Sequence, residues 1–192
     1  MRRFAIALAG LAALLSTALG AQAPASPSAE PTAAALLLNE RQPLPGLLAG
    51  GSTKAPDEHA RLAGAGYRLY VDLRTDKEVT PEIQTAAEAA GLVYARLPIG
   101  GEAELDLASA RALHELLHGP QPAPTALVCA SGNRSGALLA LEAFWLHGTP
   151  GAEALELGKR AGLTRLESSV RSLLGLPPLP EASPAPAPPA RR

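Results

Sequence analysis

The stretch TALVCASGNRSGALLALEAFWLH, residues 125–147, contains in direct succession a short apolar run, a polar loop and a long helical pattern. The apolar run 125–128 is typical of a buried strand, and residues 133–147 predict a helix. The loop between them starts at Cys129, the single cysteine of the chain. Ligands of open α/β sheets bind beyond the carboxyl ends of strands. Loop 129–136 is therefore the first candidate for a functional site.

Outward from this stretch, predicted strands and helices alternate along the chain. Strands are expected at 47–51, 68–74 and 92–99. Helices are expected to start near 56–58, at 80–82 with Thr80 as cap, and at Asp106, and two more lie between 151 and 174. Such alternation predicts an α/β fold, a three-layer sandwich whose central, parallel-rich sheet carries helices on both faces.

The two ends of the chain have a different composition. Arg2 and Arg3 precede a charge-free apolar run at 4–20 and small residues at 21–23. This pattern predicts a secretory signal peptide over 1–23; an uncleaved anchor is the alternative, although the run is marginal for spanning ~30 Å of hydrocarbon. No cysteine follows for lipidation, so we expect a periplasmic or secreted protein with no stable membrane insertion after cleavage. Residues 24–42 are expected to be a linker, 43–176 one domain, and 177–192 a proline-rich disordered tail.

Composition argues against a nucleic-acid partner. The net charge is −1 and only 3% of residues are aromatic, which leaves neither a cationic surface for phosphates nor a stacking platform for bases. Hydrophobic residues make up 47% of the chain, as expected of a globular protein. No cofactor is implied.

The loop after Val128 combines residue types suited to nucleophilic chemistry on an oxyanion. Backbone N–H groups of a strand–helix turn can form an anion-binding nest, here from Ala130, Ser131, Gly132 and Asn133. A thiol placed there has its pKa lowered and becomes a nucleophile. Arg134 offers a planar fork for oxygens, and Ser135 a hydroxyl for the thiolate. The alternative is a buried structural cysteine.

These residues resemble the cysteine-dependent phosphatases of the dual-specificity type and, more closely, the bacterial beta-lactamase hydrolase-like, phosphatase-like domains. The resemblance implies a phosphatase fold, Cys129 as phosphoenzyme nucleophile, Arg134 as phosphate clamp, and a small-molecule or peptide phosphate as substrate. It covers GAG 64–66, YVDLR 70–74, LPIGG 97–101, CASGNR 129–134, ALELG 154–158 and AGLT 161–164.

The loop departs from the phosphatase pattern in two places. Val128 stands where these enzymes usually have histidine, and four residues rather than five separate Cys129 from Arg134. The shorter loop resembles that of the rhodanese sulfurtransferases, whose cysteine carries sulfur from a donor substrate. Phosphatase, sulfurtransferase and a binding module without turnover therefore remain alternatives.

A phosphatase also needs an acid that protonates the leaving oxygen. The segment after Pro98 offers Glu102, Glu104 and Asp106, of which Asp106 is more simply a helix cap. Asp72 and Arg74 alternate onto one face of their strand near the same sheet edge, where they either orient the loop or form an ordinary ion pair.

The sequence His114-Glu-Leu-Leu-His118 matches the H-E-x-x-H pattern of zinc proteases, with Glu142 as a conceivable third ligand. Helix geometry argues against a metal, because Ala110, Leu113 and Leu117 form the buried stripe and both histidines fall on the polar side. We therefore expect no metal site here. His59 and His147 are expected to be solvated.

Overall fold

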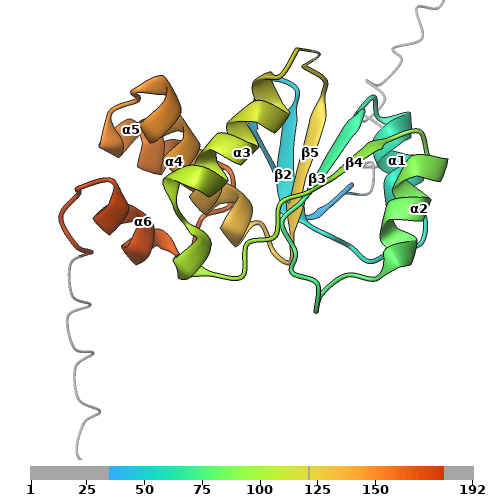
Figure 1. Ribbon diagram of the computed structural model, residues 1–192, viewed down its shortest axis with the longest axis horizontal. Helices are drawn as coiled ribbons and strands as arrows, with labels where there is room; N and C mark the ends of the chain where they lie inside the picture. The colour runs from blue at the N-terminus through green and yellow to red at the C-terminus, as the bar shows by residue number, and fades with distance from the viewer. Residues whose placement is uncertain (1–34, 121, 180–192) are drawn as a thin grey trace, which may run out of the picture. The chain divides into compact units, whose positions relative to one another are not determined.

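The computed structural model describes residues 35–120 and 122–179, which form a five-stranded sheet and the helices around it (Figure 1). The strands are β1 Leu38–Leu44, β2 Leu47–Gly51, β3 Leu69–Asp72, β4 Val93–Arg96 and β5 Thr125–Cys129. The helices are α1 Glu58–Gly64, α2 Pro81–Ala89, the 3-10 turn η1 Glu102–Glu104, α3 Leu107–His118, α4 Asn133–His147, α5 Gly151–Arg160 and α6 Glu167–Leu173.

The sheet has the order β1-β2-β5-β3-β4, and every pairing except that of β1 with β2 is parallel. The register places Gly51 of β2 and Cys129 of β5 side by side, with Asp72 of β3 opposite Val128. The carboxyl ends of three parallel strands therefore meet at the loop that follows Cys129.

Helices cover both faces of the sheet. Helices α1 and α2 lie on one face and α3 to α6 on the other (Figure 1). Side chains alternate accordingly along β5, so that Val128 belongs to the core under α1 and α2, whereas Leu127 and Cys129 belong to the core under α3 to α6. The predicted three-layer α/β sandwich is confirmed.

Helix α4 is the central helix of its layer and is buried on nearly all sides over its first three turns. It approaches α5 and the segment after it closely at Gly136, where an added Cβ would lie 2.3 Å from the backbone nitrogen of Leu163. A side chain does not fit there. This contact fixes the start of α4, and with it the loop that carries Arg134.

The domain begins earlier in the chain than the predicted boundary at residue 43. Residues 38–42, predicted as linker, belong to β1, and Leu37 before them is buried. Strand β1 pairs on one side only, its register is irregular, and most of its side chains are exposed. Its polar sequence therefore lacks the alternation that reveals a half-buried strand. The predicted signal peptide 1–23 and residues 180–192 of the tail lie outside the described residues.

Most helix starts agree with the sequence, although not every cap does. Asp106 accepts a hydrogen bond from the Ser109 N–H at 2.8 Å and caps α3 as predicted. Thr80 precedes α2 but makes no side-chain cap bond. No helix within residues 35–120 and 122–179 combines the length and apolar character needed to cross a membrane.

Candidate active site

Cys129 ends β5 with its side chain buried and its sulfur facing the loop. The Gly132 N–H donates to Sγ at 3.1 Å. Gly132 has φ +93°, a left-handed conformation that glycine adopts without a Cβ penalty. This residue turns the chain directly from the loop into α4 and points its N–H back at the sulfur.

The surroundings of the sulfur favour the thiolate. Burial by itself would raise the pKa of the Cys129 thiol, but hydrogen bonds from the N–H groups of Ser131, Ser135 and Gly132 and from the Ser135 hydroxyl outweigh it and lower the pKa. Of the four residues predicted to supply N–H groups, Ser131 and Gly132 direct theirs at the sulfur, whereas Ala130 and Asn133 are not among its donors and Ser135 is.

Arg134 lies beside the thiol and is held by Glu78 and by the carbonyls of Ile99 and, at 3.4 Å, Leu73. Its Nη1 donates to the Ile99 carbonyl at 2.7 Å and to Glu78 Oε2 at 2.8 Å, while Nη2 donates to Glu78 Oε1 at 2.6 Å. The paired Glu78 carboxylate, opposed by burial and supported by the charge of Cys129, raises the pKa of Arg134. Of its five N–H groups, the ones on Nε and on the second position of Nη2 are not directed at Glu78 or Ile99, and a hydrogen bond to the Cys129 sulfur also raises the pKa of Arg134.

Glu78 is a site residue that sequence reasoning missed. It lies in the loop after β3, where Thr75 donates from N and Oγ1 to Glu78 Oε2 at 2.8 and 2.9 Å. The hydrogen bond from Arg134, against some desolvation, lowers the pKa of Glu78 to about 2. The carboxylate is thus ionised at neutral pH and positions Arg134. The sequence signal that could have identified Glu78 is its position just after the carboxyl end of β3, a strand that neighbours β5, where ligands of such sheets bind.

The other predicted loop residues have diverse environments. Ser135 is fully buried, and its hydroxyl also lies 3.2 Å from the Leu127 carbonyl. Ala130 and Ser131 lie at the surface side of the turn. The Asn133 side chain points away from the sulfur: its Oδ1 accepts from Thr164 N at 2.8 Å. Asn133 thereby ties α4 to the segment after α5, a structural role that its position in the loop did not reveal.

Two of the three candidate acids are engaged by backbone groups of their own segment. Asp106 caps α3, Glu104 Oε2 accepts from Gly101 N at 3.0 Å, and Glu102 is exposed. No hydrogen bond joins any of them to Cys129 among the described residues. The segment nonetheless reaches the site through its backbone, because the Ile99 carbonyl binds Arg134.

Asp72 and Arg74 form a buried ion pair rather than an exposed one. Arg74 Nη2 lies 2.8 Å from Asp72 Oδ2, and Arg74 also donates to the Tyr70 hydroxyl, which in turn donates to Glu58 at 2.9 Å. Glu58 then accepts from the Ser52 hydroxyl. Since Ser52 N donates to the Cys129 carbonyl at 2.9 Å, this network links the neighbouring strands to the loop. Glu58 was not anticipated from sequence.

One cavity adjoins the loop and another reaches the site through Glu78. The cavity at the loop, of about 390 Å³, is lined by Ser131 together with Arg41 and Arg165. The second, of about 360 Å³, is lined by Lys54 and Arg74 but also by the carboxylates of Glu58, Glu78 and Glu82. The two arginines beside Ser131 therefore fit an anionic substrate, whereas the second cavity carries charges of both signs.

The predictions for the histidines hold in part: His118 and His147 are exposed, as expected, and His59 is not. His59 is buried and its ring lies 4.9 Å from that of Tyr70, so its predicted solvation is wrong. His114, His118 and His147 come together around Glu142. What the sequence did not predict is this clustering, which arises because α4, which carries Glu142, packs against that side of α3.

The parallel-rich α/β sandwich is similar to the tyrosine and dual-specificity phosphatase fold. Residues 47–144 match the family described as beta-lactamase hydrolase-like protein, phosphatase-like domain, and the chain belongs to this family. A comparison with curated proteins finds no match.

Solved structures agree on the fold. A candidate phosphatase from Shewanella putrefaciens has a TM-score of 0.56 at 17% identity, covering 72% of this chain and 94% of that one. A candidate phosphatase from Neisseria meningitidis has a TM-score of 0.57 at 16% sequence identity, and the match covers 69% of this chain and 96% of that one. The catalytic core of the PP-IP phosphatase SIW14 from S. cerevisiae has a TM-score of 0.55 at 13% sequence identity, and the match covers 72% of this chain and 85% of that one. At these identities the likeness is one of fold.

Proposed function

We propose that this protein is a cysteine-dependent phosphatase that hydrolyses a phosphate ester through a Cys129 phosphoenzyme. The observation that carries the proposal is the ring of N–H groups around a buried sulfur of lowered pKa, with Arg134 beside it. The thiolate attacks phosphorus, the S–P bond forms and the ester oxygen leaves with a proton. Water then cleaves the S–P bond and releases inorganic phosphate.

Transition-state charge is stabilised by groups that are already in place. The N–H groups of Ser131 and Gly132 and the two remaining N–H groups of Arg134 are suited to equatorial phosphoryl oxygens. Glu78 holds the guanidinium in one orientation. With its lowered pKa, Glu78 is a positioning residue and not the acid. Of Glu102, Glu104 and Asp106, Glu102 is the candidate donor of the proton, because the other two carboxylates accept hydrogen bonds from backbone N–H groups.

Sulfur transfer is the second candidate, favoured by a specific observation. Only four residues separate Cys129 from Arg134, and Glu78 occupies both terminal nitrogens of that arginine. A small ring with a partly neutralised cation suits one terminal sulfur with a single charge. In that reaction the thiolate attacks the outer sulfur of a donor such as thiosulfate, so that a persulfide forms and sulfite leaves. Cyanide then removes the outer sulfur as thiocyanate and regenerates the thiolate.

The deciding experiment assays reduced, purified protein on an aryl phosphate and, separately, on thiosulfate with cyanide. We expect phosphate release that is abolished in Cys129→Ser, and phosphocysteine on Cys129 by intact mass spectrometry. Arg134→Lys should lose about 2–4 kcal/mol of transition-state stabilisation, because a point charge does not replace a fork. Arg111→Lys, an exposed arginine on α3, is the matched control.

The alternatives give different results. Thiocyanate release that depends on Cys129, without phosphate release, establishes the sulfurtransferase. If neither product forms but Cys129→Ser still binds vanadate or phosphate, the loop is a binding module. Phosphatase activity gained only after insertion of one residue behind Asn133 would mean that loop span is the obstacle.

We also propose export to the periplasm or beyond, on the basis of the sequence pattern of residues 1–23. Intact mass of the protein from a periplasmic extract should correspond to a chain starting near Pro24. A retained amino terminus in the membrane fraction would instead support the uncleaved anchor. In an oxidising compartment the lone thiol would need an external reductant.

A further inference from the structure

Four side chains from two helices converge at the end of the sheet opposite to Cys129. His114 and His118 project from one face of α3, and Glu142 and His147 come from the last part of α4. The four ligand atoms lie within 4.8 Å of one another. Thr125, at the start of β5, lines the same cavity as His118 and His147. Since Cys129 ends that strand, this His/Glu cluster is separate from the candidate active site.

The three rings approach a single oxygen atom. Glu142 Oε1 lies 2.8 Å from His114 Nδ1, 2.8 Å from His147 Nε2 and 3.4 Å from His118 Nε2. A carboxylate oxygen has two lone pairs, so two hydrogen bonds would saturate it. Three ring nitrogens directed at one point beside a carboxylate are the arrangement of ligands around a cation.

The Glu142 carboxylate needs a positive charge. Its side chain is only 3% exposed, and an ionised carboxylate is costly to bury without a counter-charge. Within the part of the chain that the structure describes, no lysine or arginine forms an ion pair with it; its ion-pair partners are the three histidines. A divalent cation would supply the charge and accept the nitrogen lone pairs together.

The spacing of the rings fits a tetrahedral ion. The ring centres of His114, His118 and His147 are 4.7, 5.1 and 5.0 Å apart. Imidazoles on a tetrahedral zinc ion with Zn–N of about 2.0–2.1 Å have centres about 5 Å apart. Three nitrogens and one carboxylate oxygen form a ligand set that suits zinc.

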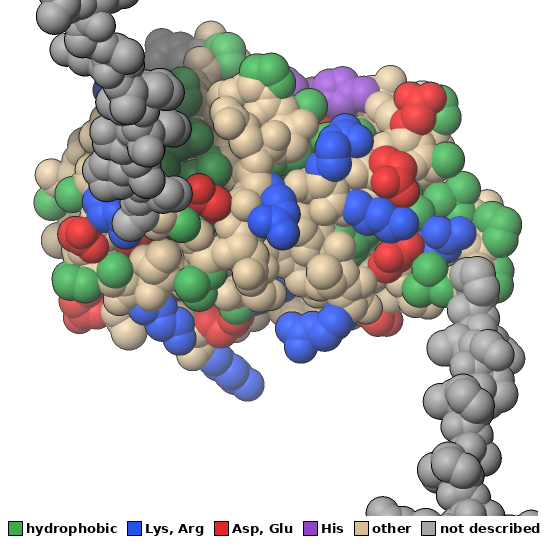
Figure 2. All heavy atoms as spheres, turned by 180° about the vertical axis from the view of Figure 1, so that it is seen from behind, with side chains coloured by type: hydrophobic (Ala, Val, Ile, Leu, Met, Phe, Trp, Pro, Cys, Tyr) green, Lys and Arg blue, Asp and Glu red, His purple; other side chains and the backbone are tan. Residues whose placement is uncertain are grey.

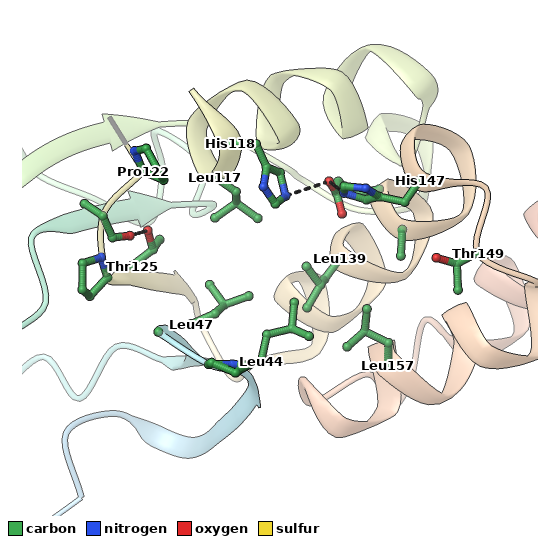
Figure 3. Close-up of a pocket in the computed structure, with 16 residues that line it drawn as sticks. Leu44, Leu47, Leu117, His118, Pro122, Thr125, Leu139, His147, Thr149 and Leu157 are labelled. Carbon is green, nitrogen blue, oxygen red and sulfur yellow. Dashed lines mark hydrogen bonds and ion pairs between the residues drawn. The ribbon is translucent and has the colours of Figure 1, made fainter. Parts of the chain in front are cut away.

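An ion can reach this cluster from solvent. His118, Glu142 and His147 lie on the wall of a cavity of about 560 Å³ whose other walls are largely aliphatic. Figure 3 shows His118 and His147 directed at the same carboxylate, above Leu139 and Leu157. Histidine side chains also reach the surface at the upper edge of the face in Figure 2.

We propose that His114, His118, Glu142 and His147 bind one Zn²⁺ ion that links the carboxyl-terminal ends of α3 and α4. Four protein ligands close the coordination shell, which is the arrangement of a structural zinc site. Glu115, the acid of the H-E-x-x-H pattern, is exposed on α3 and is not among the ligands. The site is therefore not a protease centre, and the spacing of the pattern serves only to place two histidines one turn apart.

The test measures zinc binding to untagged protein stripped with a chelator. Titration calorimetry should give one Zn²⁺ per chain, and the ion should raise the melting temperature. His118→Ala and His147→Ala should each weaken binding by more than about 100-fold, since losing a partner outside the coordination shell already costs about 10–100-fold. Glu115→Gln is the matched control on α3 and should bind like wild type.

Both variants change side chains that are 45% and 42% exposed, so we expect them to fold, and their circular dichroism spectra should match that of wild type. The visible spectrum of bound Co²⁺ gives a second readout in the wild type and should indicate tetrahedral coordination. Wild-type protein that binds no zinc, or variants that bind it unchanged, would overturn the proposal. An octahedral Co²⁺ spectrum would overturn the closed four-ligand site.

Discussion

Replacing Gly51 by alanine should displace the candidate active-site loop, because the new methyl group would collide with the backbone of Ala130 and Ser131. Gly51 ends β2 beside Cys129, and a Cβ there would lie 2.5 Å from the Ala130 carbonyl oxygen and 2.9 Å from the Ser131 Cα. Ordinary contact begins at 3.4 Å, so the loop must move by about 0.9 Å. Overpacking of this kind costs about 1–3 kcal/mol.

The displaced atoms belong to the segment that supplies the N–H groups of Ser131 and Gly132. Moving these groups away from the sulfur weakens the bonds that lower the pKa of Cys129. Gly51→Ala should therefore raise the midpoint of the alkylation rate against pH and, by misplacing the loop by about 1 Å, reduce turnover by up to about 100-fold.

Urea unfolding and iodoacetamide alkylation from pH 5 to 10 test both effects on one preparation. Gly64→Ala is the control, because a Cβ at Gly64 meets nothing within 4 Å; it should leave the alkylation midpoint unchanged. The reasoning fails if Gly51→Ala matches wild type in unfolding free energy and alkylation midpoint.

Three further predictions concern the neighbours of the loop. Glu78→Gln removes the bidentate partner of Arg134 and should lower the free energy of unfolding in urea by only about 1 kcal/mol, because the carboxylate is one-third exposed. Turnover should fall by about 10–100-fold. A small loss of turnover, no larger than the loss of stability, would argue against a positioning role. Asn133→Ala leaves the Thr164 N–H without its acceptor and should cost about 1–3 kcal/mol in the same assay, whereas an unchanged value would deny it that structural role. The folded-state pKa of Cys129 lies below its ordinary value of 9.0. The thiolate therefore stabilises the fold fully above pH 9.0, and this stabilisation is lost as pH falls through the folded-state pKa. The unfolding free energy of wild type relative to Cys129→Ser should increase as pH rises toward about 9, and a difference that does not change with pH would contradict the lowered pKa.

Local signals in the chain were sufficient for the sandwich and for the loop at its edge. Alternation of apolar runs with capped helical patterns predicted the parallel strands β2, β3 and β5 and the helices between them. Cys129 and Arg134 could be proposed as site residues because ligands of open α/β sheets bind beyond the carboxyl ends of strands, and the order of strand, loop and helix is readable from the sequence. Strand β1 was not predicted, because most of its side chains are exposed and its sequence therefore lacks the alternating apolar residues by which a strand is recognised.

The sequence by itself determined which elements form, since helix and strand periodicity and caps depend on neighbours within a few residues. Only the tertiary structure decided which side chains share a site. Glu78 meets Arg134 across 56 positions and His114 meets Glu142 across 28. Such partners are set by strand order and by which face of α4 packs on α3, and no local pattern carries that information. For the same reason the polar side of the H-E-x-x-H helix gave no sign that α4 brings Glu142, considered from sequence only as a conceivable ligand, and a third histidine to it.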